Sequence, residues 1–464
     1  RVGMLVMDEA FDMWNMGKNA NDYHLYFKEW WQRDMESMII RDRNHPSVVF
    51  WSIGNEIPEH GGASDGWEWS QKLASYARWL DGTRFITSAV NNVAPPREEM
   101  MEMIKNGAGF GFNSPAMKEW NRKHFHELTE GYTSPLDVVG YNYVDYLYDL
   151  VVEKYPQRVM LGTESFPLEM DIQWNYVESI PNLIGDFIWT SFDYLGEAGI
   201  GRAVYTQPGT ELKMGWGGEY PYRLANDSDF DIIGMERPQL AYHRIVWGSD
   251  ETYIGVRDPK NYGLKEHVSQ WGWPELFHSW TWGSEIKSTT IEVYSRAEEV
   301  EVFVNGKSVG RKPAGKENRF KAEFELEYQP GTLEAVSYCG GAEVSRDKLE
   351  TTGAPAALRL IPERNEIIAD GNDLAYVKVE IVDSNGRYVP GAEFKLRASL
   401  MGEGRLAAFG AAAPSTDENY TKGEFTSYNG IAMAIIRAGK AAGTAVLKVD
   451  SEELGSAETE IKLK

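Results

Sequence analysis

The first half of the chain alternates short apolar runs with stretches of helical periodicity. Strand-like apolar runs lie at residues 4–7, 48–52, 84–89, 137–142, 159–162 and 186–190. Two helical faces between them are formed by Phe27, Trp31, Met35 and Met38 and by Trp69, Leu73, Tyr76 and Leu80. Repeated strand-then-helix units with apolar strands are typical of a parallel sheet that is buried on both faces. We therefore predict an α/β domain over residues 1–249.

Local signals predict where some of these helices begin and end. Asp65 is the predicted N-cap of the second helix, and Asp81 with Gly82 is predicted to end it. Pro238 is predicted to open a last helix that runs to about Trp247, because proline is favoured at the first helical position.

After about Ser249 the pattern changes to strict alternation of apolar and polar residues. The alternating apolar sets are Val300, Val302 and Val304; Phe320, Ala322, Phe324, Leu326 and Tyr328; and Ala375, Val377, Val379 and Ile381. The pairs Asn305–Gly306 and Asn385–Gly386 are hairpin signals, and a break at residues 353–355 separates two regions of similar length. We predict two small β-sandwiches, over residues 250–353 and 354–464. The chain is thus predicted to be multidomain, α/β plus all-β.

Composition and charge narrow the range of functions. The formal net charge of −23 would repel phosphate backbones and anionic membranes, so nucleic acid is not an expected partner. No apolar run approaches the roughly 18 residues of a membrane span. The 16 Trp and 24 Tyr residues suit stacking on sugar faces, although large domains also pack many aromatic rings in their cores. The single cysteine, Cys339, allows no internal disulfide and leaves localisation open, the bacterial periplasm and exterior included.

Two glutamates follow predicted strands directly. Residues 51–56 (WSIGNE) end in Glu56, and residues 159–164 (VMLGTE) end in Glu164. In parallel α/β barrels the strand ends and the loops after them build the active site. Glycoside cleavage needs such a pair, one carboxyl to protonate the leaving oxygen and one carboxylate to meet the oxocarbenium-like carbon. A lone glutamate after a strand is more often a solvated loop residue or a helix cap, so spacing by itself leaves both interpretations open.

Longer motifs resemble family 2 glycoside hydrolases, which include β-galactosidases, β-glucuronidases and β-mannosidases. Residues 41–48 (RDRNHPSV) followed by 51–56 closely resemble the acid/base signature of that family. Further likenesses to barrel strands and to accessory β-domains of a β-galactosidase-like subgroup lie at 8–14, 185–190, 229–234, 302–308 and 373–377. The resemblance covers nearly the whole chain. It implies a partial TIM (β/α)8 barrel, strands three to eight, followed by two immunoglobulin-like β-sandwiches.

The resemblance also implies roles for individual residues. Glu56 would be the general acid/base and Glu164 the nucleophile, with Glu169 and Glu197 as fallback acids. The implied substrate-binding residues are Asn55 for the sugar 2-hydroxyl, Tyr143 as the tyrosine that hydrogen-bonds the nucleophile, Trp189 as the aromatic platform, and Trp14 as a pocket wall. For Trp14, core packing is the competing explanation. Because two close carboxyls repel, one proton should be retained, and we expect Glu56 to carry it.

The implied function is a retaining exo-β-glycosidase, most simply a β-galactosidase acting on terminal β-D-galactosides of glycosides, oligosaccharides or polysaccharides. No cofactor and no metal are expected. A β-glucuronidase or another β-glycosidase of the family is an alternative, and so is a non-catalytic carbohydrate-binding fragment. Only six of eight barrel strands are found, and the first two are expected to come from a preceding segment or a partner. A homo-oligomer is a further option.

Overall fold

The computed structural model describes residues 3–105, 114–212, 214–283 and 285–464. It divides into two compact units, residues 1–188 and residues 189–464, which are taken in turn. The predicted three-domain bounds at residues 249 and 353 stay a prediction.

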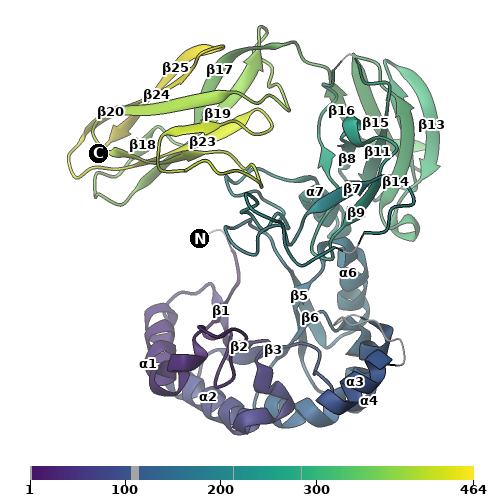
Figure 1. The fold of residues 1–464 in the computed structure, drawn as a ribbon, viewed down its shortest axis with the longest axis vertical. Coiled ribbons are helices and arrows are strands. Elements are labelled where there is room, and N and C mark those ends of the chain that lie inside the picture. Colours follow the sequence, from purple (N-terminus) through teal and green to yellow (C-terminus); the bar gives the residue numbers. More distant parts are fainter. Residues whose placement is uncertain (1–2, 106–113, 213, 284) are drawn as a thin grey trace. The chain divides into compact units, whose positions relative to one another are not determined.

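The first unit contains a six-stranded parallel sheet in which the strands follow one another in chain order (Figure 1). The strands are β1 (Val6–Glu9), β2 (Val48–Asn55), β3 (Phe85–Val90), β4 (Val139–Asn142), β5 (Met160–Ser165) and β6 (Leu183–Ile188). They coincide with the six predicted runs to within a few residues. All six carboxyl ends therefore lie at the same edge of the sheet.

Helices connect these strands and cover one face of the sheet (Figure 1). They are α1 (His24–Asp42), α2 (Gly66–Leu80), α3 (Arg97–Lys105), α4 (Pro115–Thr133), α5 (Tyr148–Lys154) and α6 (Met170–Ser179). Phe27, Trp31 and Met35 of α1 are buried, as their spacing predicts, whereas Met38 is partly buried. Asp65 does precede α2, but its backbone is left-handed (φ 60°) and its side chain makes no capping hydrogen bond. The predicted capping role of its side chain is therefore wrong.

The strands of the first unit alternate between two faces. Leu183 packs in the core under the helices, whereas its neighbour Ile184 is 51% exposed. Leu5, Phe85 and Phe187 are also exposed, and together with Ile184 they line an apolar hollow of about 650 Å³. Within this unit the sheet is open, with β1 and β6 as its edges. In β3 and β4 consecutive residues are buried, so the prediction of burial on both faces holds for these central strands, whereas it fails at the edge strands β1 and β6.

The second unit begins with β7 (Ala203–Thr206) and α7 (Pro238–Val246), the helix predicted to start at Pro238. Two antiparallel four-stranded sheets follow, in the orders β10-β8-β11-β14 and β13-β12-β15-β16. Their strands are β8 (Thr252–Arg257), β9 (Lys265–Val268), which pairs with β7, β10 (Leu276–Phe277), β11 (Ser288–Ser295), β12 (Glu299–Val304), β13 (Lys307–Pro313), β14 (Lys321–Glu327), β15 (Thr332–Cys339) and β16 (Ala342–Glu350). Asn305 and Gly306 both have positive φ, and they form the predicted hairpin turn between β12 and β13.

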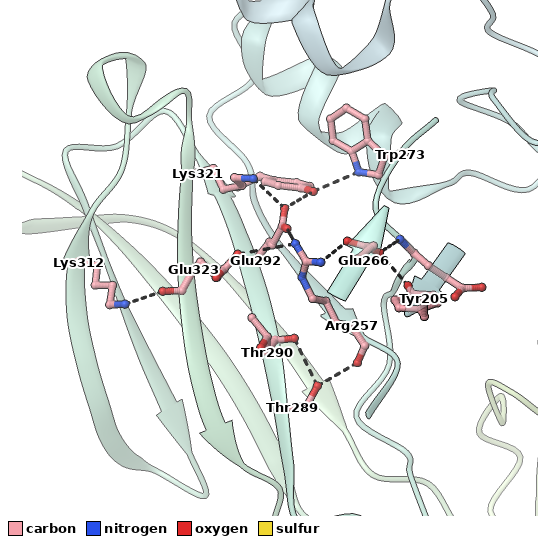
Figure 2. A network of polar contacts seen from close by, with 12 residues as sticks. Tyr205, Arg257, Glu266, Trp273, Thr289, Thr290, Glu292, Lys312, Lys321 and Glu323 are labelled. Carbon is pink, nitrogen blue, oxygen red and sulfur yellow. Dashed lines mark hydrogen bonds and ion pairs between the residues drawn. The ribbon is translucent and has the colours of Figure 1, made fainter. Parts of the chain in front are cut away.

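An ion-pair network joins β8, β9 and β11 beside this β-sandwich (Figure 2). Arg257 of β8 lies between the carboxylates of Glu266 and Glu292, and the side chain of Glu292 is 1% exposed. Tyr205 of β7 donates a hydrogen bond of 2.7 Å to Glu266. Because a buried carboxylate without a partner is costly, Arg257 both neutralises Glu292 and ties the β7–β9 pair to the sandwich.

The remaining residues form a second pair of antiparallel sheets, β17-β19-β23-β21 and β18-β25-β24-β20-β22, in which only the β18–β25 pair is parallel. The strands are β17 (Pro355–Pro362), β18 (Glu366–Ile367), β19 (Leu374–Asp383), β20 (Lys395–Gly402), β21 (Arg405–Gly410), β22 (Glu424–Thr426), β23 (Ile431–Arg437), β24 (Gly443–Ser451) and β25 (Gly455–Leu463). Ala375, Val377, Val379 and Ile381 have no exposed surface, so the alternation in β19 faces a core between the sheets. The predicted fold class is confirmed. None of the helices described is both long and apolar enough to cross a membrane.

The helix layer can be tested at Phe27, which has no exposed surface and packs edge-on against Phe11 and Trp69. We expect Phe27→Ala to lower the free energy of unfolding of this unit by about 3–5 kcal/mol, because it leaves a cavity in a closely packed core. Leu25→Ala, at a 57% exposed position of the same helix, is the matched control and should change it by less than about 0.5 kcal/mol. Urea unfolding followed by tryptophan fluorescence measures both. Equal shifts for the two variants would contradict this packing.

Candidate active site

The two predicted catalytic glutamates lie at the carboxyl edge of the parallel sheet. Glu56 directly follows β2, and Glu164 is the last residue but one of β5. The backbone N–H of Glu56 donates to the carbonyl oxygen of Ala89 at the end of β3, at 2.9 Å. The carbonyl oxygen of Glu164 accepts from the backbone N–H of Tyr143 after β4, at 3.0 Å. Both glutamates are therefore held by the neighbouring strand, and both are half-buried.

A chain of side-chain hydrogen bonds crosses three strand ends. Thr163 of β5 donates to Asn142 Oδ1 at 2.6 Å, and Asn142 Nδ2 donates to Asn55 Oδ1 at 2.9 Å. Asn142 Nδ2 also donates to Glu56 Oε1 at 3.2 Å. Asn142 thus contacts both Asn55 and Glu56, and it fixes which end of the Asn55 amide faces β4. The sequence did not single out Asn142 or Thr163, although Asn142 ends the predicted strand 137–142 and Thr163 lies in the motif 159–164.

Tyr143 contacts Glu164 through its side chain as well as its backbone. Its hydroxyl donates a hydrogen bond to the Glu164 carboxylate, which favours the ionised form of that group. The Tyr143 ring stacks on Phe166, with ring centroids 4.4 Å apart. The contact is the one that the family resemblance implies for this tyrosine.

Two residues of this edge adopt left-handed backbone conformations. Glu56 has φ 47° and Tyr143 has φ 57°. Residues other than glycine reach this region at a cost of roughly 1 kcal/mol, and such strain concentrates at functional sites. At both positions the strand ends abruptly, and the side chain is turned toward its neighbours at the strand ends.

Burial and like charge dominate the electrostatics of the carboxyl pair. Burial, together with the negative charge of Glu56, raises the pKa of Glu164 to about 8. Burial also raises the pKa of Glu56, and the positive charge of Lys18 and the hydrogen bond from Asn142 oppose that rise. The two carboxyls therefore interact, and at neutral pH the pair retains a proton.

A third carboxyl group lies in the same region. Glu9 ends β1, and its Oε2 accepts a hydrogen bond of 2.6 Å from Ser52 Oγ on β2. Burial raises the pKa of Glu9, and the charge of Glu9 in turn raises the pKa of Glu164. Its position two residues after the predicted strand 4–7 is the signal that would have found it.

The two tryptophans proposed from the sequence have different surroundings. Trp14 has no exposed surface, stacks on Tyr132, and donates from its indole nitrogen to the carbonyl oxygen of Ile53 at 3.1 Å. It is a core residue in this structure, and contact of its ring with a sugar stays a prediction. Trp189 is the first residue of the second unit, and its ring packs edge-on against Tyr194. The predicted place of this ring under a sugar also stays a prediction.

The fallback acids have other partners or surroundings. Glu197 accepts a hydrogen bond from the hydroxyl of Tyr194 in the second unit, and Glu169 ends a short 3-10 turn before α6. In the part of the chain that the structure describes, no group of three or more His, Cys, Asp or Glu side chains is arranged to hold a metal ion.

Comparison with known proteins agrees with the fold. The model of the glycosyl hydrolases family 2 TIM barrel domain matches residues 1–149, and that of the glycoside hydrolase family 2 C-terminal domain 5 matches residues 358–460. A domain of unknown function matches residues 287–345. Both named models are those of a single class of glycoside hydrolase.

Individual relatives extend the likeness over the chain. β-Galactosidase BoGH2A of Bacteroides ovatus is 30% identical over 98% of this chain. A β-glucuronidase of Formosa agariphila is 29% identical over 79% of it. The crystal structure of a glycosyl hydrolase family 2 member from Bacteroides cellulosilyticus is 33% identical over the whole chain, with a TM-score of 0.84. The chain belongs to glycoside hydrolase family 2.

The matches cover this chain more fully than they cover the relatives. The chain spans 55% of the length of the Bacteroides ovatus relative and of the Bacteroides cellulosilyticus structure, and 32% of the Formosa agariphila relative.

The raised pKa of Glu164 predicts how stability depends on pH. Its pKa is about 8 in the folded protein against an ordinary value of 4.5, so between these values the folded state holds a proton that the unfolded state has released. The folded state must therefore lose stability through Glu164 as the pH rises from about 5 to 8. We expect Glu164→Gln to remove this loss, so that the variant gains stability relative to wild type over that range. Urea unfolding at several pH values measures it.

Glu153→Gln, at an exposed position of α5, is the control and should leave the pH dependence as in wild type. A stability difference between Glu164→Gln and wild type that stays constant from pH 5 to 8 would contradict the raised pKa.

Proposed function

We propose that the protein at its natural length is a retaining exo-β-glycosidase, with Glu56 as general acid/base and Glu164 as nucleophile. The observation that carries the proposal is the pair itself. Two half-buried glutamates from the ends of β2 and β5 interact electrostatically, and each is hydrogen-bonded by a neighbouring strand-end side chain, Asn142 or Tyr143. Retaining glycosidases use such a pair at a separation of about 5–5.5 Å.

In the first step Glu56 protonates the glycosidic oxygen while the Glu164 carboxylate attacks the anomeric carbon. The bond to the leaving group breaks as the glycosyl–Glu164 ester forms, and the configuration at that carbon inverts. The productive form therefore has the shared proton on Glu56. The hydrogen bond from Tyr143 stabilises the Glu164 carboxylate, but burial and the charge of Glu56 outweigh it and raise the pKa of Glu164 to about 8. The proton must therefore pass from Glu164 to Glu56 before the attack.

In the second step Glu56, now ionised, takes a proton from water as the water attacks the same carbon. The ester bond to Glu164 breaks, and the second inversion restores the β configuration. Esterified Glu164 carries no charge, so the repulsion that held the proton on Glu56 is gone and Glu56 can act as the base.

We propose a β-galactoside as the substrate, in agreement with the name of the Bacteroides ovatus relative. A glucuronide would add a carboxylate to be recognised. Lys18 is a cation whose charge acts on both glutamates, and it is already paired with Asp12 at 2.7 Å. This pairing favours a neutral sugar. A panel of 4-nitrophenyl β-glycosides tests the choice: faster cleavage of the glucuronide than of the galactoside would select the β-glucuronidase alternative.

The substrate-binding roles remain as the resemblance implies them. Asn55 would donate to the 2-hydroxyl of the sugar being cleaved, and Trp189 would form the platform beneath it. Trp14 would form a pocket wall, and in the structure it also supports β2 through its hydrogen bond to Ile53.

The two glutamates can be told apart by the products of rescue with azide. Glu164→Gly cannot form the glycosyl ester, but azide can enter the cavity and attack an activated β-galactoside directly, giving the inverted α-azide. Glu56→Ala still forms the ester, and it should lose far more activity on poor leaving groups than on nitrophenolates, which need little acid help. Azide then attacks the ester and returns a β-azide after two inversions. Proton NMR of the azide products measures both stereochemical outcomes.

A β-azide from Glu164→Gly, or wild-type rates in that variant, would assign the nucleophile to another residue. Glycan binding without hydrolysis by the wild-type protein would instead select the non-catalytic alternative.

A further inference from the structure

Two charged residues of the segment after β1 contact Asn55 from the side opposite Asn142. Asn55 Nδ2 donates to Asp12 Oδ1 at 3.1 Å, and Lys18 Nζ donates to the same oxygen at 2.7 Å. Lys18 Nζ also donates to the backbone carbonyl oxygen of Asn55, at 3.1 Å. Asp12 therefore holds the side chain of Asn55, and Lys18 holds both Asp12 and the Asn55 backbone.

These contacts define the orientation of the Asn55 amide from both ends. Asn142 donates to its oxygen at 2.9 Å, and Asp12 accepts from its nitrogen. A carboxylate cannot donate, so a flipped amide would place its oxygen against Asp12 and lose both hydrogen bonds. An amide nitrogen carries two N–H groups, and Asp12 takes one of them. The other N–H is thereby given a fixed direction.

The Asp12–Lys18 ion pair has little to contribute to stability. The Asp12 side chain is 55% exposed and that of Lys18 is 27% exposed. Ion pairs this open to water contribute about 0–1 kcal/mol, and ordering a lysine side chain costs conformational entropy. A role in the site itself accounts better for two charged side chains that converge on one asparagine.

The charge of Lys18 also acts on the carboxyls of the site. It opposes the rise in the pKa of Glu9, of Glu56 and of Glu164, which burial causes in each case. The charge of Asp12 acts in the opposite direction on Glu9 and Glu56. Lys18 thus favours the ionised forms of three carboxyls that lie at three strand ends.

We infer that Asp12 and Lys18 are a positioning pair, which holds Asn55 in the orientation that its proposed contact with the 2-hydroxyl of the sugar requires. The inference rests on the proposed function, to which it adds two positioning residues. Because contacts to the 2-hydroxyl strengthen in the transition state, the pair acts mainly on the rate of the first step.

The test compares two substrates that differ only in the 2-hydroxyl, 4-nitrophenyl β-galactoside and its 2-deoxy counterpart, with the protein at its natural length. We expect Asp12→Ala to lower kcat/KM for the 2-hydroxy substrate by about 10- to 100-fold, the effect of one hydrogen bond to a charged group. The same variant should change kcat/KM for the 2-deoxy substrate by less than about threefold, since that substrate lacks the partner. An equal loss on both substrates would overturn the inference, because a merely structural role acts on both.

Two variants test Lys18. Lys18→Met keeps about the same side-chain length and removes the positive charge, whereas Lys18→Arg keeps both the charge and the hydrogen-bond donors. Lys18→Met should show the same substrate dependence as Asp12→Ala. It should also move the acid limb of the kcat/KM–pH profile to higher pH, because the carboxyls lose a cation that lowers their pKa. Lys18→Arg should restore most of both effects. Lys28→Met, at an exposed position of α1, is the control and should behave as wild type; an unmoved acid limb in Lys18→Met would count against the inference.

A binding measurement separates this inference from the proposed function. Deoxygalactonojirimycin carries the 2-hydroxyl and galacto-configured isofagomine lacks it, so titration calorimetry reports the contact without turnover. If Asp12→Ala weakens the binding of deoxygalactonojirimycin but not of the isofagomine, the inference is supported. This holds even if the wild-type protein hydrolyses no glycoside, because the lack of hydrolysis would contradict only the proposed function. Equal weakening of both inhibitors, or of neither, overturns the inference even if hydrolysis is confirmed.

Discussion

The active-site edge of this protein is organised by the repulsion between carboxyl groups that a parallel sheet brings together. The ends of β1, β2 and β5 lie at one edge, and they carry Glu9, Glu56 and Glu164. Burial makes ionisation of each of them unfavourable, and the charge of one raises the pKa of another. Such a cluster persists only where hydrogen-bond donors and a cation face it, so the polar contacts around it follow from this constraint.

The donors that face the cluster come from different strands, and this arrangement makes the site depend on the whole sheet. Ser52 reaches across from β2 to Glu9, Asn142 from β4 to Glu56, and Tyr143 from the end of β4 to Glu164. A shift of one strand by a single residue would turn its donor to the opposite face. The buried rings between α1, α2 and the sheet therefore matter to the chemistry, because they hold the strands in register.

Much of the fold could be predicted because apolar periodicity is a local property. The six strands, α1, α2, α7 and the hairpin at Asn305 follow from spacing and turn chemistry. Glu56 and Glu164 were found through motifs at strand ends. The pairing partners were not, since they depend on register, which shifts irregularly between Ser52 and Asn55 and between Tyr141 and Asn142. Lys18 and Asp12 come from an irregular segment whose path no periodicity predicts.

The left-handed backbone at Glu56 has a consequence for protein engineering. A glycine there would lose the carboxyl and relieve the conformational strain, so a screen for thermal resistance would enrich it. Tyr143 has the same conformation, but a glycine there would also lose the stacking on Phe166, so the gain is confined to Glu56. Random libraries selected on stability should therefore drift toward inactive proteins at position 56, a local form of the trade-off between robustness and activity. Selection for heat resistance in this protein should therefore include an activity assay.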